Sequence, residues 1–187
     1  MNTFFSAALE IQSFIESQNW DFCFIGGVAV LGRGEIRMTQ DLDITLLTGF
    51  GEENKFIKKM LSNFETRISG AEEFAMENRI ILIKSSNGVS IDISLGGIDF
   101  EKEMIKRADF FEFLTNCSLK ICSAEDLIIQ KAFAGREKDW MDIKGIIAKQ
   151  ENLNWEYIIL QLEPLCDIKG GQKVINKLLK VRKNELF

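Results

Sequence analysis

The chain has 187 residues, 46% of them hydrophobic and 27% charged, with a net charge of −5 and no histidine. These values are typical of one soluble globular domain, or one domain with a small helical annex. The acidic balance excludes a chain-wide basic surface for tight, non-specific nucleic-acid binding. The lack of histidine excludes Ser-His-Asp and Cys-His nucleophilic schemes and histidine-ligated zinc, so any acid–base or metal chemistry must use other side chains.

The sequence predicts neither a targeting segment nor a membrane span. Its N-terminus alternates polar and apolar residues at helical spacing, unlike a signal peptide. No apolar stretch approaches the length that crosses a bilayer. None of the four cysteines has CxxC spacing. We therefore expect a reduced, cytoplasmic protein without a membrane partner.

The first two thirds of the chain predict a mixed α/β region. Periodic apolar residues predict helices over residues 3–18 and 53–63, and a short helix over residues 28–31. Apolar or alternating runs predict strands over residues 21–26, 42–47, 79–84, 89–94 and 118–121. The Asn87-Gly88 dipeptide indicates a hairpin between the third and fourth of these strands.

From Ser123 onward the pattern becomes helical. Ser123 and Asp126 resemble a capping box at the start of a helix. Helices are expected over residues 124–134, 137–149, 154–163 and 171–183, with Gly135, Pro164 and Gly170-Gly171 separating them. We expect an α/β core over residues 1–121 and a helical C-terminal region over residues 122–187 packed on it. The predicted fold class is α/β (α+β): a mixed β-sheet flanked by helices, with a C-terminal helical bundle.

Two aspartates stand at the start of the 42–47 strand. Asp41 and Asp43 are two residues apart, so strand alternation puts both carboxylates on the face opposite Leu42 and Ile44. Like charges this close raise one another's pKa unless a cation neutralises them. Carboxylate oxygens are ligands for Mg²⁺, with Mn²⁺ as the alternative metal. A strand whose acids simply face solvent explains the pair, taken alone, about equally well.

A third acid, Asp92, is expected in the middle of the 89–94 strand, on the face opposite Ile91 and Ile93. Strand interiors disfavour aspartate. If this strand lies beside the 42–47 strand, Asp92 completes a three-carboxylate cluster with Asp41 and Asp43. Such a cluster suits the metal ions of phosphoryl transfer, and Asp92 is also placed to accept the proton of an attacking hydroxyl.

Two further pairs of residues suit a phosphate ligand. Gly26 and Gly27 follow the first strand and precede a short helix, where backbone amides approach phosphate closely; a simple tight turn is the commoner explanation. Arg37 and Thr39 stand just before the acids, in reach of a triphosphate, although Arg37 fits a surface charge equally well.

Together these segments resemble a known superfamily. The runs Gly26-Gly27-Val28-Ala29, Arg37-Met38-Thr39-Gln40-Asp41-Leu42-Asp43 and Ile91-Asp92-Ile93 are similar, in order, to the GG, [DE]x[DE] and third-acid motifs of the nucleotidyltransferase superfamily that includes DNA polymerase β. The Gly-Ser of many members is Gly-Gly here. The resemblance implies a mixed sheet flanked by helices, with an NTP and Mg²⁺ as ligands.

A downstream segment narrows the resemblance. The run Ser123-Ala124-Glu125-Asp126-Leu127, Lys131, and the run from Ala134 to Ile143 are similar to the "AEDL…K…GR.KD..D" helix pair of the abortive-infection (AbiEii-like) branch. Members of that branch include toxins of toxin–antitoxin pairs that act on tRNA, antibiotic nucleotidyltransferases and uncharacterised proteins. An antitoxin protein is therefore one partner that the resemblance implies. Residues after 150 lie outside it.

Lys131 is unusual because it falls on the apolar stripe of its helix, with Leu127. A buried charge needs partners. Lys131 either reaches the nucleotide phosphates or pairs with Asp139 or Asp142 on the next helix, and the sequence favours neither reading. For the two aspartates a structural role is slightly favoured.

The leading hypothesis is metal-dependent transfer of NMP from an NTP to a hydroxyl acceptor. Asp41, Asp43 and Asp92 form the catalytic and metal-binding set, while the nucleotide-binding set comprises Gly26, Gly27, Arg37, Thr39 and Lys131. The acceptor is either RNA, such as tRNA, or a small hydroxyl-bearing molecule, and the acidic pI leans slightly against a large RNA. The alternative is a catalytically inactive nucleotidyltransferase-like protein with a binding or regulatory role.

Overall fold

The computed structural model describes residues 3–35, 37–169 and 171–183. The chain folds into two compact units. The first, called the sheet unit, comprises Met1–Val28 and Met38–Cys122, and the second, called the helical unit, comprises Ala29–Arg37 and Ser123–Phe187. The segment Ala29–Arg37 thus belongs with the C-terminal helices. The linear division between residues 121 and 122 stays a prediction.

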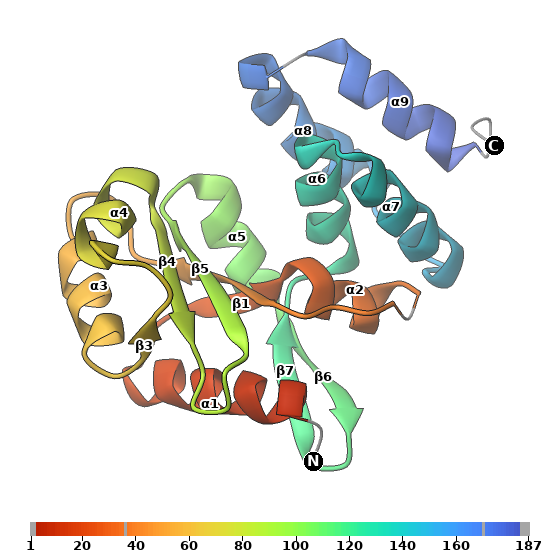
Figure 1. Ribbon diagram of the computed structural model, residues 1–187. Coiled ribbons are helices and arrows are strands. Elements are labelled where there is room, and N and C mark those ends of the chain that lie inside the picture. Colours follow the sequence, from red (N-terminus) through yellow and green to blue (C-terminus); the bar gives the residue numbers. More distant parts are fainter. Residues whose placement is uncertain (1–2, 36, 170, 184–187) are drawn as a thin grey trace. The chain divides into compact units, whose positions relative to one another are not determined.

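The sheet unit is built around a seven-stranded mixed sheet with the strand order β3-β4-β5-β2-β1-β7-β6. The strands are β1 (Phe22–Ile25), β2 (Leu42–Leu47), β3 (Glu65–Thr66), β4 (Ile80–Lys84), β5 (Ser90–Gly96), β6 (Asp109–Leu114) and β7 (Cys117–Ile121). β2 runs parallel to β5, and β1 runs parallel to β7. The other neighbouring strands are antiparallel, including the β4–β5 hairpin visible in Figure 1.

The five predicted strands are all present, whereas β3 and β6 lie outside the prediction. β3 has only two residues, too few for a periodic signal. β6 carries consecutive aromatic residues at the edge of the sheet, and most of its side chains remain exposed or half-buried, so it shows no clean alternation. A short or edge strand therefore escapes detection by hydrophobic pattern.

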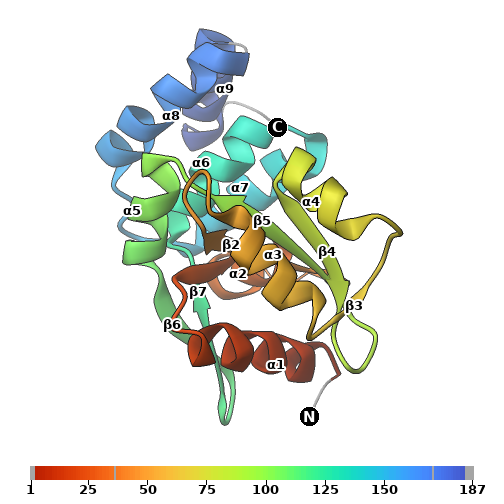
Figure 2. The ribbon, with the colours of Figure 1, turned by 90° about the vertical axis from the view of Figure 1, so that its left-hand side faces the viewer.

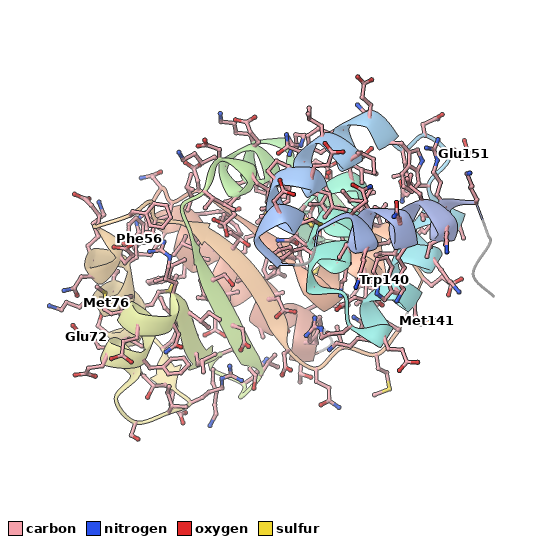
Figure 3. The ribbon with its side chains drawn as sticks, turned by 90° about the horizontal axis from the view of Figure 1, so that it is seen from above. Phe56, Glu72, Met76, Trp140, Met141 and Glu151 are labelled. Atoms are coloured by element: carbon pink, nitrogen blue, oxygen red, sulfur yellow. The ribbon has the colours of Figure 1, made fainter. Side chains whose placement is uncertain are left out.

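Four helices lie wholly within the sheet unit: α1 (Thr3–Ser17), α3 (Glu53–Leu61), α4 (Ala71–Asn78) and α5 (Asp99–Arg107). α1 and α3 were predicted; α4 and α5 were not. α4 buries only Ala75, so it lacks an apolar stripe. α5 is stabilised at its start by Glu101, whose carboxylate accepts hydrogen bonds from the backbone N–H groups of Gly97 and Ile98. The Lys58–Glu72 ion pair links α3 to α4, and Figure 3 labels Glu72.

One face of the sheet supplies the core of this unit. Alternate residues of β2 and β5 are fully or almost fully buried: Leu42, Ile44, Leu46, Ile91 and Ile93. The turn of the β4–β5 hairpin is tied to α1, because Asn87 donates to the Thr3 carbonyl and Ser86 donates to Glu10. Figure 2 shows the hairpin turn beside the N-terminal end of α1. Since side chains alternate along a strand, the intervening residues of β2 and β5 point to the other face.

The helical unit contains α6 (Ala124–Ala134), α7 (Glu137–Lys149), α8 (Trp155–Lys169) and α9 (Gln172–Arg182), which pack together. α2 (Gly26–Arg33) begins in the sheet unit and ends in this one. The predicted fold class, including the C-terminal helices, is confirmed. None of the described helices is long and apolar enough to cross a membrane.

One detail of the helical unit corrects a prediction, and a second concerns its packing. Pro164 lies inside α8, so the expectation that it separates two helices was wrong. A proline in a helix frees the carbonyl four residues earlier, and that residue, Leu160, is on the exposed side of α8, where water can satisfy the carbonyl. On α7, Trp140 is buried with Lys177 of α9 stacked over its ring, whereas the neighbouring Met141 is exposed (Figure 3).

Candidate functional site

Two of the three predicted acids occupy paired positions on neighbouring strands. Asp43 of β2 and Asp92 of β5 are register partners in the parallel pair. Register partners project to the same face of a sheet whose strands are about 4.8 Å apart. The expected pairing of these strands is therefore present, and both carboxylates lie on the face opposite the buried Ile44 and Ile93.

The third acid, Asp41, stands immediately before β2, and its charge acts on Asp92. Burial raises the pKa of Asp92, the negative charge of Asp41 raises it further, and Arg67 opposes both effects without cancelling them. Arg67 Nη2 donates a hydrogen bond to Asp92 Oδ1. The site therefore combines mutually repelling carboxylates with the cation of Arg67.

The acids suit a divalent metal by their chemistry, although they are not arranged as a closed cluster. Among the residues that the structure describes, no group of three or more histidine, cysteine, aspartate or glutamate side chains is placed to hold a metal ion. The Asp92 carboxylate is engaged by Arg67 instead. Paired carboxylates at Asp43 and Asp92, with Asp41 close enough to shift the pKa of Asp92, are nevertheless the hard oxygen donors that Mg²⁺ prefers.

Both glycines at the start of α2 are needed for close approach of the acidic segment. A Cβ on Gly26 would lie 2.0 Å from Asp43 Oδ2, and a Cβ on Gly27 would lie 2.2 Å from Thr39 Oγ1. Thr39 Oγ1 is also 3.3 Å from the Asp41 carbonyl, to which it donates. The Asp43 carboxylate thus lies over the first turn of α2, where the helix dipole favours a negative charge. We conclude that Gly26 and Gly27 let the segment from Thr39 to Asp43 pack on this helix end.

Replacing Gly26 by alanine is expected to lower the free energy of unfolding by more than the backbone strain of a positive φ would by itself. The positive φ of 57° costs an alanine about 1–2 kcal/mol, and the collision with Asp43 adds about 1–3 kcal/mol. Gly70→Ala is the matched control, because Gly70 has a φ of 65° but the nearest atom to the new Cβ, Glu73 Oε2, would be 3.8 Å away. Urea denaturation measures the free energy of unfolding of both variants. Equal decreases in the two would show that a Cβ at residue 26 does not collide with Asp43.

Two predicted nucleotide ligands, Arg37 and Lys131, meet at one carboxylate in the helical unit. Lys131 Nζ is 2.7 Å from Asp142 Oδ2 and 3.2 Å from Asp139 Oδ1. Arg37 contacts the same Asp142 through Nε at 2.7 Å and Nη2 at 3.1 Å. Lys131, Asp139 and Asp142 are all buried, so the core-facing position predicted for Lys131 is confirmed. A role for Arg37 and Lys131 in nucleotide binding stays a prediction.

Asp139 has the strongest set of counter-charges in this network. Burial acts to raise its pKa, but hydrogen bonds from Arg136 and the charge and hydrogen bond of Lys131 outweigh burial and leave the pKa lowered. Arg136 Nε lies 2.7 Å from Asp139 Oδ2. The carboxylate is therefore held ionised between α6 and α7, and the helix pair depends on its charge.

Asp139→Asn is expected to destabilise the protein in a pH-dependent way. Because the folded-state pKa of Asp139 lies below its unfolded value, the carboxylate stabilises the fold above the ordinary pKa of aspartate, about 4, and the stabilisation is lost as the pH falls below that value. Urea unfolding of wild type and variant at about pH 7 and about pH 3 measures this. The difference between them should shrink at the lower pH, and a difference independent of pH would contradict the assignment.

Comparison with known proteins assigns the chain to a family. Residues 2–162 match the family described as "Nucleotidyltransferase of unknown function (DUF6036)". The chain belongs to this nucleotidyltransferase family. The predicted superfamily is therefore confirmed, while membership of the AbiEii-like branch stays a prediction. A search of curated protein sequences finds no match.

Two solved structures share the fold of this chain. An antigenic nucleotidyltransferase-like protein from Paracoccidioides brasiliensis is 16% identical, with a TM-score of 0.51 over 95% of this chain and 92% of that one. The lincosamide antibiotic adenylyltransferase LnuA, solved with lincomycin bound, is 15% identical, with a TM-score of 0.51 over 78% of this chain and 97% of its own. At these identities the matches show the fold alone.

Arg67 is the residue of the candidate site that the sequence did not predict. It follows the two-residue strand β3 and is 25 positions from Asp92. No periodic pattern surrounds it, and a single arginine in a polar stretch is usually a solvated charge. Only the strand order β3-β4-β5 brings it to Asp92.

Proposed function

We propose that this protein transfers NMP from an NTP to a hydroxyl acceptor, with a divalent metal at Asp41, Asp43 and Asp92. The observation that carries the proposal is the register pairing of Asp43 with Asp92, with the Asp41 charge acting on the same carboxylate. Membership of a nucleotidyltransferase family supports it. A cluster of like charges is costly without a cation, and a metal–nucleotide complex removes that cost.

Each residue has a defined part in the proposed reaction. Mg²⁺ bound by Asp41 and Asp43 would neutralise the charge of the reacting phosphate. Asp92 accepts the proton of the acceptor hydroxyl, and its raised pKa brings it closer to the range useful for a general base at neutral pH. The hydroxyl oxygen bonds to the α-phosphorus, and pyrophosphate leaves with its electron pair. The backbone amides at the start of α2 suit a phosphate oxygen.

The acceptor that we propose is a small hydroxyl-bearing molecule. The net charge of −5 disfavours a long polyanionic acceptor. A protein of the same fold is a lincosamide antibiotic adenylyltransferase, which supports a small acceptor here by analogy of fold. The second candidate is a toxin that modifies tRNA and is held by an antitoxin protein. It is favoured by the AbiEii-like helix pair, whose Lys131 and Asp142 form the buried ion pair.

Labelled nucleotides test the proposal and its acceptor. The protein is incubated with Mg²⁺, each of the four α-³²P-labelled NTPs in turn, and either total tRNA or a panel of hydroxyl-bearing antibiotics. We expect label on a small molecule, together with pyrophosphate release. Label on tRNA alone would select the toxin, and no transfer of label to any acceptor would count against an enzyme.

The alternative of an inactive binding or regulatory protein has two observations in its favour. Asp92 is engaged by Arg67, and the described acids do not form a metal-holding group. Calorimetric titration with NTPs and Mg²⁺ separates this alternative from the enzyme, because binding of no NTP would favour the inactive protein.

A further inference from the structure

Arg67 is an intramolecular cation at the carboxylate site. Its Nη2 donates to Asp92 Oδ1, and its side chain is 22% exposed against 40% for Asp92. Its positive charge opposes the effects of burial and of Asp41 on Asp92. Arg67 therefore pairs with the same carboxylate, Asp92, that the proposed function assigns to a metal ion.

The backbone fixes the direction from which Arg67 reaches Asp92. The N–H of Arg67 donates to the Leu82 carbonyl at 3.1 Å, and Leu82 of β4 is the register partner of Asp92 of β5. The Arg67 side chain thus spans one intervening strand, β4, on the face that carries Asp92. The backbone hydrogen bond of Arg67 to β4 fixes the start of the side chain, and the guanidinium at its end reaches Asp92.

The guanidinium is incompletely satisfied in this position. Arg67 Nε is buried and has no hydrogen-bond partner. Buried donors without partners are rare, and each calls for an explanation, of which a bound ion is one. A guanidinium presents donors in a planar fork that matches the oxygens of a phosphate group. A phosphate oxygen beside Arg67 would satisfy the buried donor that Asp92 leaves unpaired.

We propose that Arg67 is a positioning residue that occupies Asp92 in the nucleotide-free protein and exchanges it for a phosphate oxygen of the incoming NTP. This inference rests on the proposed function. The guanidinium repels a metal ion from Asp92 until the triphosphate offers Arg67 another anion. Metal and nucleotide consequently bind together, and the metal alone binds weakly.

Binding of Mn²⁺ without nucleotide tests this exchange. Free Mn²⁺ is followed by electron paramagnetic resonance during titration of wild type and Arg67→Met. We expect the variant to bind Mn²⁺ about tenfold more tightly or better, because a unit charge beside the cation site is removed. Adding Asp92→Asn to that variant should abolish the gain. Equal or weaker binding by Arg67→Met would overturn the proposal.

Three further variants make the comparison specific. Lys84→Met removes an exposed cation that pairs with Glu65 on the same sheet, and it should leave Mn²⁺ affinity unchanged. Arg67→Lys keeps the charge and should keep the weak binding. Arg67→Gln replaces the methionine variant if thermal unfolding in EDTA shows that the latter does not fold, and it should give the same gain.

Adding ATP, CTP, GTP or UTP to the titrations separates this inference from the proposed function. If wild type binds Mn²⁺ with an NTP but Arg67→Met gains nothing without it, only the exchange is wrong. If no variant binds Mn²⁺ with or without any NTP, the proposed metal site itself is wrong.

Discussion

Asp43→Asn is expected to lower Mg²⁺-dependent NMP transfer by about a thousandfold or more. The substitution removes the carboxylate that lies between Asp92 and the start of α2. Asp43 is paired in register with Asp92, and its Oδ2 lies over Gly26. A metal that neutralises a reacting phosphate contributes several kcal/mol to the transition state, and each 1.36 kcal/mol is tenfold in rate. Pyrophosphate release measures the loss, with the acceptor found by label transfer.

The control for this prediction is an aspartate of the same unit outside the site. Asp99 lies in the first turn of α5 and is 95% exposed, so Asp99→Asn should retain nearly full activity. Asparagine has nearly the same shape as aspartate, and thermal unfolding should show that both variants fold. Transfer by Asp43→Asn at the wild-type rate would remove Asp43 from the site.

Lys131→Met is expected to lower the free energy of unfolding by about 3–5 kcal/mol, the usual cost of breaking a buried ion pair from one side. Lys131 lies between Asp139 and Asp142, and all three side chains are buried. The variant keeps the length of the side chain but leaves two buried carboxylates without their shared cation. Arg37 and Arg136 each retain a contact with one of them, so partial compensation is expected.

Urea denaturation followed by circular dichroism measures this loss. Lys173→Met is the control, because Lys173 is an exposed cation of α9 and its removal should change stability by less than about 0.5 kcal/mol. A small loss in Lys131→Met would show that Arg37 and Arg136 suffice for the network. It would then strengthen the prediction that Lys131 serves a bound nucleotide.

Local pattern predicted the regular elements well. The α6 and α7 helices begin and end at the predicted residues, and β2 spans its predicted range. The Ser123 cap is also present, with its side chain accepting from the Asp126 N–H. α4 was missed because it buries only Ala75 and shows no continuous apolar stripe, and α5 was missed because few of its residues are apolar.

The candidate site was predictable in composition but not in its contacts. Asp43 was identified by its two-residue spacing from Asp41, and Asp92 because the interior of a strand disfavours aspartate. The parallel pairing of β2 with β5 places Asp43 and Asp92 in register. Arg67 was beyond reach, since only the strand order places it at Asp92. Likewise, the Arg37–Asp142 pair joins residues 105 positions apart, and a local sequence pattern cannot predict such a contact.

Calorimetric titration of NTPs in the presence of Mg²⁺ tests the central claim most directly. ATP, CTP, GTP and UTP are each titrated into wild type and Asp43→Asn, with and without Mg²⁺. At least one NTP should bind wild type saturably and only with Mg²⁺, and Asp43→Asn should lose that binding. Failure of every NTP to bind wild type, or equal binding by Asp43→Asn, would contradict a metal-dependent nucleotide site at Asp41, Asp43 and Asp92.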